Sequence, residues 1–418
     1  MSAYLLPSDI LLPDFSKVDG TKWAVVACDQ YTSEPAYWHG VKELVGEEPS
    51  MLSLILPELW LDKTEECVPE IHANMQAYEG DVLERHPNTM LYLERTQSNG
   101  LVRRGIVGMI DLEHYDYNKG STSLVRATEG TVLERIPPRL AVRRGAGLES
   151  PHVMLLIDDP DCTVIEPIAA RADSLPLAYD FELMQKSGHV KAHFVDTIGV
   201  GRITRALCAL ASPEHARKQY RTDAAPLLFA VGDGNHSLAT AKAAYEEIKA
   251  ELGERALNHP ARYALVEVVN LHDPALHFEP IYRVLFNVDV DDVLKELQAY
   301  SYAQQGLVNP QKATFLCGKR RGRIYFMNPT EQLVVGTLQA FIDLYLAKHP
   351  EAHVDYIHGK EAVQTLSAAD RTIGFLFSGM EKSELFPTVM KDGALPRKTF
   401  SMGAAADKRF YLECRKIR

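Results

Sequence analysis

The chain has few cysteines, no apolar run long enough to cross a membrane, and no excess of basic residues. No two of its six cysteines form a C-x-x-C pair, so the pattern predicts reduced, buried thiols rather than a disulfide framework. The longest apolar runs, such as 227–231, have the length of a strand, whereas a membrane helix needs about 20 residues. The N-terminal stretch lacks a basic region and carries Pro7 and Asp9, which disfavours a signal peptide. We therefore expect a cytoplasmic protein.

The charge balance limits the kind of partner that the protein can have. Lys and Arg number 45 against 56 Asp and Glu, which gives a net charge of −11. This balance disfavours binding to nucleic acid, which needs a basic surface to displace counterions, and docking on anionic membranes. It does not forbid a local basic pocket for a small phosphorylated molecule.

Several well-known active-site motifs are missing. The sequence contains no P-loop, no G-x-G-x-x-G after a predicted strand, no G-x-S-x-G and no H-E-x-x-H. These absences disfavour the common nucleotide-binding loops, the α/β-hydrolase nucleophile and the zinc peptidases.

The alternation of apolar runs and amphipathic stretches predicts a mixed α/β (α+β) protein. At roughly 150 residues per domain, 418 residues suggest two or three packed subdomains. We place them at 1–150, 151–285 and 286–418. The clearest individual predictions are buried strands at 22–27, 152–158, 227–231 and 262–270, a hairpin at 90–110, and a helix from about 237 to 252. A further helix is expected with Ser33 as its cap and with Glu34 and Pro35 in its first turn, and Gly46 should stop it. The connection through the helix at 237–252 is long enough to permit parallel pairing of the strands that flank it.

The strongest local signal is the turn GDGNH between a predicted strand and a predicted helix. Gly232 and Gly234 allow a sharp turn and the close approach of a ligand. The amides of Asn235, His236 and Ser237 would open the helix and lack intrahelical partners, which suits a phosphate. His236 could add a donor, and the other plausible interpretation of the turn is an ordinary helix start capped by Asp233 or Asn235.

Two further stretches carry mixed or basic charge. Residues 126–139 contain Arg126, Glu129, Glu134, Arg135 and Arg139, which form either a solvated helix face or a carboxylate beside phosphate-binding arginines. In this stretch Thr128 is a plausible helix N-cap, and Pro137 and Pro138 should prevent continuation of the helix.

The segment LPRKTFSMG at 395–403 places Arg397 and Lys398 beside hydroxyl groups. It is either a basic turn near a C-terminal strand or a pair of cations that bind phosphates.

The turn and four other stretches carry a family resemblance. FAVGDGNHSLATAKAAYEE resembles the signature of the domain of unknown function 1015 (DUF1015) family, and the resemblance continues in CDQYTSEPAYW, ILPELWL, RATEGTVLERIPPR and LPRKTFSMGAAADKRFYLECR. The turn also resembles the phosphate-binding turn of the ParB and sulfiredoxin superfamily, whose members include serine kinases. The resemblance implies a ParB/sulfiredoxin-like unit within residues 151–285.

The resemblance implies nucleotide-dependent phosphoryl transfer to a small molecule, with serine or phosphoserine as the first substrate to test. Asp233, Gly234 and His236 match the superfamily turn, whereas Ser237 stands where Arg is usual. The implied site has Asp233, His236 and Glu129 as catalytic groups, Mg²⁺ on Asp233, and Gly232, Gly234, Asn235, Ser237, Arg126, Arg139, Arg397 and Lys398 as phosphate ligands. Arg126 or Arg139 is expected to replace the missing arginine, and the alternative function is a non-catalytic sensor of a nucleotide or phosphometabolite.

Overall fold

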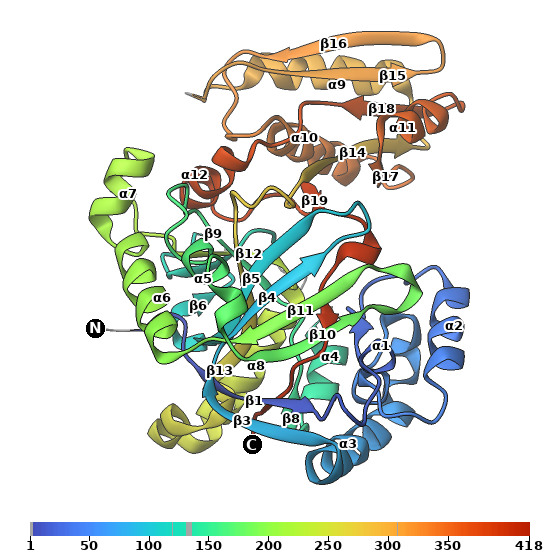
Figure 1. Ribbon diagram of the computed structural model, residues 1–418. Coiled ribbons are helices and arrows are strands. Elements are labelled where there is room, and N and C mark those ends of the chain that lie inside the picture. Colours follow the sequence, from blue (N-terminus) through green and yellow to red (C-terminus); the bar gives the residue numbers. More distant parts are fainter. Residues whose placement is uncertain (1–2, 119, 131–135, 307) are drawn as a thin grey trace. The chain divides into compact units, whose positions relative to one another are not determined.

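The chain forms two compact units in the computed structural model, which describes residues 3–118, 120–130, 136–306 and 308–418. Unit 1 consists of Met1–Leu276 and Ala404–Arg418, and unit 2 of His277–Gly403 (Figure 1). The chain therefore leaves unit 1 once and returns to it for its C-terminal segment. One sheet of unit 1 contains strands from both sides of residue 150, and the division into three subdomains stays a prediction.

A mixed sheet runs through unit 1. Neighbouring strands are antiparallel except at β13–β9, β12–β7 and β7–β6, which are parallel. In sheet order, the nine strands formed by the described residues are β10 (Leu177–Glu182), β11 (His189–Phe194), β4 (Leu91–Thr96), β5 (Val102–Asp111), β13 (Tyr263–Asn270), β9 (Met154–Ile157), β12 (Phe229–Asp233), β7 (Val125–Ala127) and β6 (Tyr115–Asp116).

Three short strand pairs complete the strands of unit 1. They are β1 (Ser8–Pro13) with β3 (Leu83–Thr89), β2 (Val25–Val26) with β20 (Phe410–Tyr411), and β8 (Leu148–Glu149) with β21 (Arg415–Lys416). Because β20 and β21 belong to the C-terminal segment, this segment is tied into unit 1 by backbone hydrogen bonds.

Both faces of the central strands are buried. Leu91 and Leu93 of β4 belong to one hydrophobic cluster, whereas Met90 and Tyr92 belong to another. This alternation explains why residues 90–93 form a continuous apolar run. Helices α2 (Pro35–Val45) and α3 (Thr64–Asp81) contribute to the first cluster, and α6 (Thr197–Leu210) and α8 (Asn235–Leu252) to the second (Figure 1). The remaining helices of unit 1 are α1 (Gly20–Trp23), α4 (Ile136–Arg143), α5 (Glu166–Ala169) and α7 (Pro213–Tyr220).

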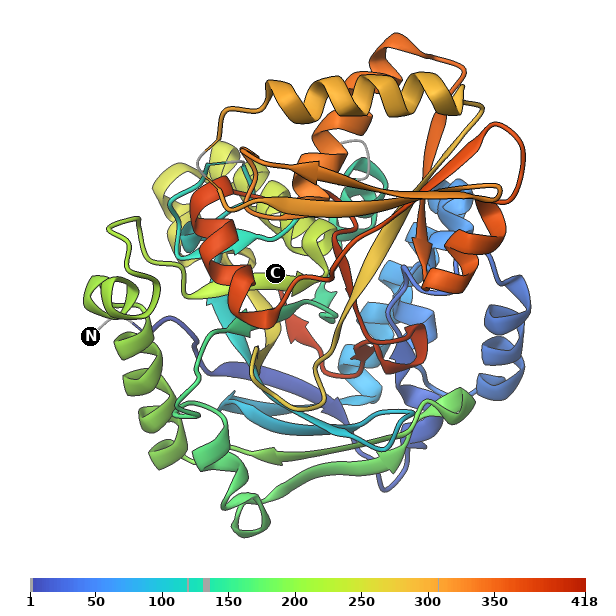
Figure 2. The same cartoon turned by 90° about the horizontal axis from the view of Figure 1, so that it is seen from above.

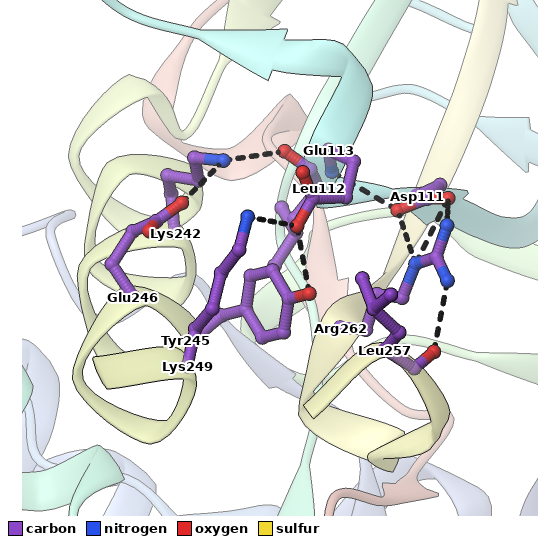
Figure 3. A network of polar contacts seen from close by, with 9 residues as sticks. All are labelled: Asp111, Leu112, Glu113, Lys242, Tyr245, Glu246, Lys249, Leu257 and Arg262. Atoms are coloured by element: carbon purple, nitrogen blue, oxygen red, sulfur yellow. Dashed lines mark hydrogen bonds and ion pairs between the residues drawn. The ribbon is translucent and has the colours of Figure 1, made fainter. Parts of the chain in front are cut away.

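Helix α8 is fixed by polar contacts as well as by its apolar face. The Tyr245 hydroxyl and the Lys249 ammonium group both donate to a carboxylate oxygen of Glu113, each at 2.7 Å (Figure 3). The ammonium group of Lys242 donates to the carbonyl of Leu112 at 3.0 Å. These contacts tie α8 to the segment that follows β5, so the position of its first turn is set by the sheet.

Unit 2 is built on an antiparallel sheet. Its strands are, in order, β16 (Arg320–Phe326), β15 (Gln311–Cys317), β18 (Thr372–Leu376), β14 (Phe278–Phe286) and β17 (His353–His358), and β19 (Phe400–Met402) also pairs with β14. Helix α9 (Val290–Ala303) lies along the β15–β16 hairpin (Figure 2). The other helices of unit 2 are α10 (Val334–Lys348), α11 (Lys360–Leu366) and α12 (Lys382–Asp392). No helix within the described residues is both long and apolar enough to span a membrane.

The mixed α/β class and most of the predicted elements are confirmed. Helix α2 ends at Val45, with Gly46 as its C-cap, but it begins at Pro35, and Glu34 rather than the expected Ser33 is its N-cap residue. The hairpin β4–β5 turns at 97–100, and α8 is joined to β13 through two 3-10 segments. The predicted strand at 22–27 is shorter, because Trp23 still belongs to α1.

Two predictions about elements were wrong. The strands flanking α8 do not pair, because β9 lies between them, parallel to β13 and antiparallel to β12. In addition, Pro137 and Pro138 do not prevent a helix at their own positions but lie in the first turn of α4, where a missing N–H and a fixed φ are tolerated. The predicted residues Glu134 and Arg135 lie outside the described residues.

Candidate functional site

The turn between β12 and α8 strongly favours a glycine at position 234. Gly234 has φ of 80° and ψ of 26°, in the left-handed region. A Cβ atom added there would lie 3.0 Å from the Cα atom of Val153 and 3.4 Å from the Cδ2 atom of His152. A register shift between Val231 and Asp233 bends the strand just before the turn. The turn is therefore packed directly against the segment that carries His152.

The first turn of α8 presents backbone donors. Leu238 donates to the carbonyl of Gly234 at 3.0 Å, so the amides of 235–237 precede the first bond of this helix. Gly234, the N-cap residue, has no side chain to satisfy them. The predicted strand–turn–helix geometry is confirmed, and phosphate binding by these amides stays a prediction.

Asp233 forms an ion pair at this turn. Its Oδ2 atom lies 3.1 Å from the Nζ atom of Lys408, and its Oδ1 atom accepts a hydrogen bond of 2.9 Å from the amide of Gly234. Burial alone would raise the pKa of Asp233, but the charges of Lys408 and His152 and these hydrogen bonds lower it below its ordinary value. Asp233 is therefore held as a carboxylate.

A continuous chain of hydrogen-bonding groups starts at the third residue of α8. The Oγ atom of Ser237 lies 3.3 Å from Nε2 of His152, and Nδ1 of His152 lies 2.7 Å from the hydroxyl of Tyr411. This hydroxyl donates to the sulfur of Cys28 at 3.0 Å. Both His152 and Tyr411 are buried, so the imidazole ring is held between Ser237 and Tyr411.

Cys28 is a thiol in this chain. Burial, together with the charge of Asp29, raises its pKa to about 11, against the smaller opposing effects of Tyr411 and Arg139. A thiolate is the nucleophilic form of cysteine, so Cys28 is poorly suited to nucleophilic catalysis near neutral pH.

A cavity of about 170 Å³ lies beside this chain of groups. Most of its lining is apolar and comes from the segment 51–61, from α3 and α4, and from α8. The polar part of the lining includes Cys28, Arg139, Arg143, His152, Ser237 and Tyr411. The cavity therefore joins an apolar interior to the helix start and to the Ser237–His152 pair.

The two arginines expected to replace the missing one have different environments. The guanidinium of Arg126 donates to the carbonyls of Ser123, Ala225 and Pro226 at 2.7–3.0 Å. Burial lowers the pKa of Arg126, and its donors serve backbone groups. Arg139 instead lines the cavity with Ser237 and forms an ion pair with Glu58. Of the two, Arg139 is the one that shares a cavity with the turn.

The remaining predicted site residues are distributed over both units. His236 and Asn235 lie in the first turn of α8, and the amide group of Asn235 is 3.5 Å from Thr128 Oγ1. Glu129 lies two residues beyond β7 and is half-buried. Arg397 and Lys398 belong to unit 2, where both lie over the ring of Tyr356.

The carboxylate of Asp233 does not build a magnesium site by itself. Both of its oxygen atoms are engaged, by Lys408 and by the amide of Gly234. Within the described ranges, three potential metal ligands come together only at Asp292, Glu296 and His349 in unit 2. A Mg²⁺ ion at the turn would need most of its ligands from phosphates and water, as is common for this ion.

Sequence reasoning missed His152, Lys408 and Tyr411. Lys408 and Tyr411 lie in a stretch that contributes to the family resemblance, but the basic pair Arg397–Lys398 just before it carried the more obvious charge signal. The contacts of Lys408 with Asp233 and of Tyr411 with His152 join distant parts of the chain. Nothing in the local sequence indicates such contacts.

Three solved structures are similar to this chain only at low sequence identity and low TM-score. A conserved hypothetical protein from Pyrococcus furiosus is 12% identical, with a TM-score of 0.36 over 75% of this chain and 95% of that one. A free serine kinase in complex with AMP is 12% identical, with a TM-score of 0.38 over 74% of this chain and 92% of that one. SbnI from Staphylococcus aureus, with a C-terminal truncation, is 11% identical, with a TM-score of 0.34 over 71% and 83%.

No curated protein matches the chain. The family described as "Protein of unknown function (DUF1015)" matches residues 13–345, which is most of the sequence and includes the turn and α8. The chain belongs to the DUF1015 family.

Proposed function

We propose that unit 1 binds a nucleotide or another phosphate-bearing molecule at the turn 232–237 and transfers a phosphoryl group to a small acceptor. The observation that carries the proposal is the position of the left-handed Gly234, which opens an 18-residue helix beside Lys408 and a cavity that contains Arg139. Backbone amides at a helix start, the positive end of the helix dipole and nearby cations are the features with which proteins bind phosphates.

The residues have separate roles in this proposal. The amides of 235–237 and the side chain of His236 hold the phosphates, and Arg139 and Lys408 offset their charge. Asp233 positions the transferred group, and Glu129 is the second candidate carboxylate. If Mg²⁺ is bound together with the nucleotide, it would supply positive charge to the phosphates. Serine is the first acceptor to test, because the turn resembles that of serine kinases.

A ligand screen tests the binding part of the proposal. Nucleotides and phosphate esters are added to the purified protein with and without Mg²⁺, and thermal unfolding is followed. At about 100 times Kd, a specific ligand stabilises the folded state by about 2.7 kcal/mol. Absence of stabilisation by every phosphate compound would contradict the proposal.

A substitution tests the catalytic part. Asp233→Asn should lower turnover by about two orders of magnitude or more, while Kd for the nucleotide changes by less than about tenfold, as expected for a group that acts in the transition state. Asp223→Asn, at an exposed position before β12, is the matched control and should leave both quantities unchanged.

The ion pair of Asp233 with Lys408 favours a second candidate function, a non-catalytic sensor of a nucleotide or phosphometabolite. A carboxylate held by a lysine and by a backbone amide is not available as a base. A sensor should be stabilised by its ligand and yet release no ADP, AMP or phosphate with any acceptor. Turnover by the wild-type protein would exclude it.

A further inference from the structure

Ser237 and His152 have the arrangement of a nucleophile with its general base. Their reactive atoms, Oγ and Nε2, are 3.3 Å apart, at the long end of the range seen for such pairs before a substrate binds. The other ring nitrogen of His152 is held at 2.7 Å by Tyr411, so the ring is fixed from both sides. We propose that Ser237 is a covalent nucleophile, activated by His152, which takes a phosphoryl group from a phosphate ester with an apolar substituent.

The direction of the hydrogen bonds is consistent with this assignment. The Tyr411 hydroxyl donates to the sulfur of Cys28, and its oxygen can then accept a hydrogen bond from Nδ1–H of His152. In that tautomer Nε2 carries the lone pair and accepts from the Ser237 hydroxyl. Tyr411 is therefore a positioning residue, which keeps the basic nitrogen of His152 directed at Ser237.

The surroundings of the pair suit a developing negative charge. Ser237 is the third residue of α8, in the turn whose backbone amides precede the first helical hydrogen bond. Asp233 is close enough to His152 for their charges to interact, so it would stabilise the imidazolium that forms when His152 accepts a proton. Nucleophile, base and stabilising groups thus lie around one turn.

The cavity selects the class of substrate. Its apolar lining is suited to an alkyl or aryl group, and its guanidinium groups, Arg139 and Arg143, are suited to an anionic phosphate. Both arginines are ion-paired, with Glu58 and Glu149, so they are already positioned. A monoester of phosphate with a small apolar alcohol satisfies both parts of the lining.

The reaction is balanced without a further reagent. Oγ of Ser237 forms a bond to phosphorus, the bond from phosphorus to the ester oxygen breaks, and the serine proton passes through Nε2 of His152 to the leaving alcohol. An acceptor hydroxyl or water, deprotonated by His152, then attacks the phosphorus of the phosphoserine, the bond from phosphorus to Oγ breaks, and the proton on Nε2 of His152 passes to Oγ and restores Ser237. This inference rests on the proposed phosphate binding, but it requires no nucleotide.

The test uses diisopropyl fluorophosphate, a small organophosphorus electrophile that reacts with activated serines. The full-length protein is incubated with the reagent, and the adduct is located by intact mass and peptide mapping. We expect one adduct per chain, on Ser237, that does not form when the protein is unfolded in urea. Ser237→Ala should abolish it, and His152→Ala should slow its formation by at least about 100-fold.

A second serine and a further variant serve as controls. Ser150 lines the same cavity, but its hydroxyl oxygen is buried and has no hydrogen-bond partner among the described residues, so it lacks both access and a base and should stay unlabelled. Tyr411→Phe removes the positioning hydroxyl and should slow labelling of Ser237 by about tenfold, which corresponds to the free energy of one hydrogen bond. An unlabelled wild-type protein, labelling of Ser150 instead, or an equal rate in His152→Ala would each overturn the inference.

Labelling of Ser237 and nucleotide turnover test the inference and the proposed function separately. Labelling of Ser237 without any nucleotide turnover would leave the inference standing and reject nucleotide-dependent transfer. Nucleotide turnover that persists in Ser237→Ala, together with an unlabelled wild-type protein, would reject the inference and leave the proposed function standing.

Discussion

The Nζ atom of Lys408 lies 3.1 Å from the Oδ2 atom of Asp233, which joins the C-terminal segment to the end of β12. Both side chains are largely buried, with 14% and 19% of their surfaces exposed. Removing one member of such a pair is costly, because the other charge is then buried without a partner. The first two predictions concern this ion pair.

Lys408→Met should reduce the free energy of unfolding by about 1–3 kcal/mol, because a buried carboxylate loses its charged donor. Adding Asp233→Asn to this variant should restore part of the loss. Urea denaturation of the two single variants and the double variant gives the coupling between the residues. Strictly additive losses would show that the pair contributes nothing.

The contribution of Asp233 to stability should depend on pH. Because its folded-state pKa is lowered, the contribution is complete above the unfolded value near about pH 4 and is lost as the pH falls through the folded value. The difference in unfolding free energy between wild type and Asp233→Asn should therefore shrink below about pH 4. Asp223→Asn, at an exposed position, controls for the removal of a carboxylate. A difference that stays constant or grows on acidification would contradict the prediction.

Gly234→Ala should be costlier than Gly253→Ala. Both glycines have positive φ, which costs about 1–2 kcal/mol for a residue with a side chain. Only at Gly234 would the added methyl group also clash with Val153, which should lower the free energy of unfolding by about 1–3 kcal/mol more. Urea denaturation of the two variants measures the difference, and equal losses would mean that Val153 moves aside without cost.

Arg139→Ala should raise Kd for phosphate-bearing ligands by about 10–100-fold, which corresponds to the free energy of one charge-assisted hydrogen bond. Ser237→Arg in the same chain should restore part of the affinity. Arg126→Ala should instead lower the unfolding free energy and leave affinity within about threefold, since its guanidinium serves three carbonyls. Calorimetric titration and denaturation separate the two effects, and the reverse pattern would assign the missing cation to Arg126.

The thiol of Cys28 should be unreactive in the folded protein. With a pKa of about 11, it reacts with a disulfide reagent at pH 8 at least about 100-fold more slowly than an ordinary peptide thiol. The exposed Cys162 gives an internal comparison. Rapid modification of Cys28 without unfolding would show that the sulfur is accessible and ionised.

Local patterns predicted the strand–turn–helix at 227–252, because periodicity, glycine placement and helix length are all properties of neighbouring residues. The same patterns failed where the partner is distant. The pairing of β12 with β9 rather than β13 depends on the order in which strands enter the sheet, which periodicity does not encode.

The prediction of the site was limited for the same reason. The sequence identified Asp233, Gly234 and Ser237 as one group, and the structure places them at one turn. It could not identify His152, whose position follows from the packing of Val153 against Gly234. Nor could it separate Arg126 from Arg139, since both occur in one stretch and differ only in what surrounds the guanidinium.

The return of the chain to unit 1 after residue 403 affects how the protein is made. Lys408 and Tyr411 follow unit 2 in the chain, so Asp233 and His152 lack these partners during synthesis until the residues after 403 have been made. Strands β2 and β8 likewise cannot pair until β20 and β21 have been synthesised. A chain that stops before residue 404 would therefore contain the complete turn 232–237 but lack the side chains that bind the carboxylate of Asp233 and the imidazole of His152. Such an incompletely folded chain should be a substrate for quality-control proteases.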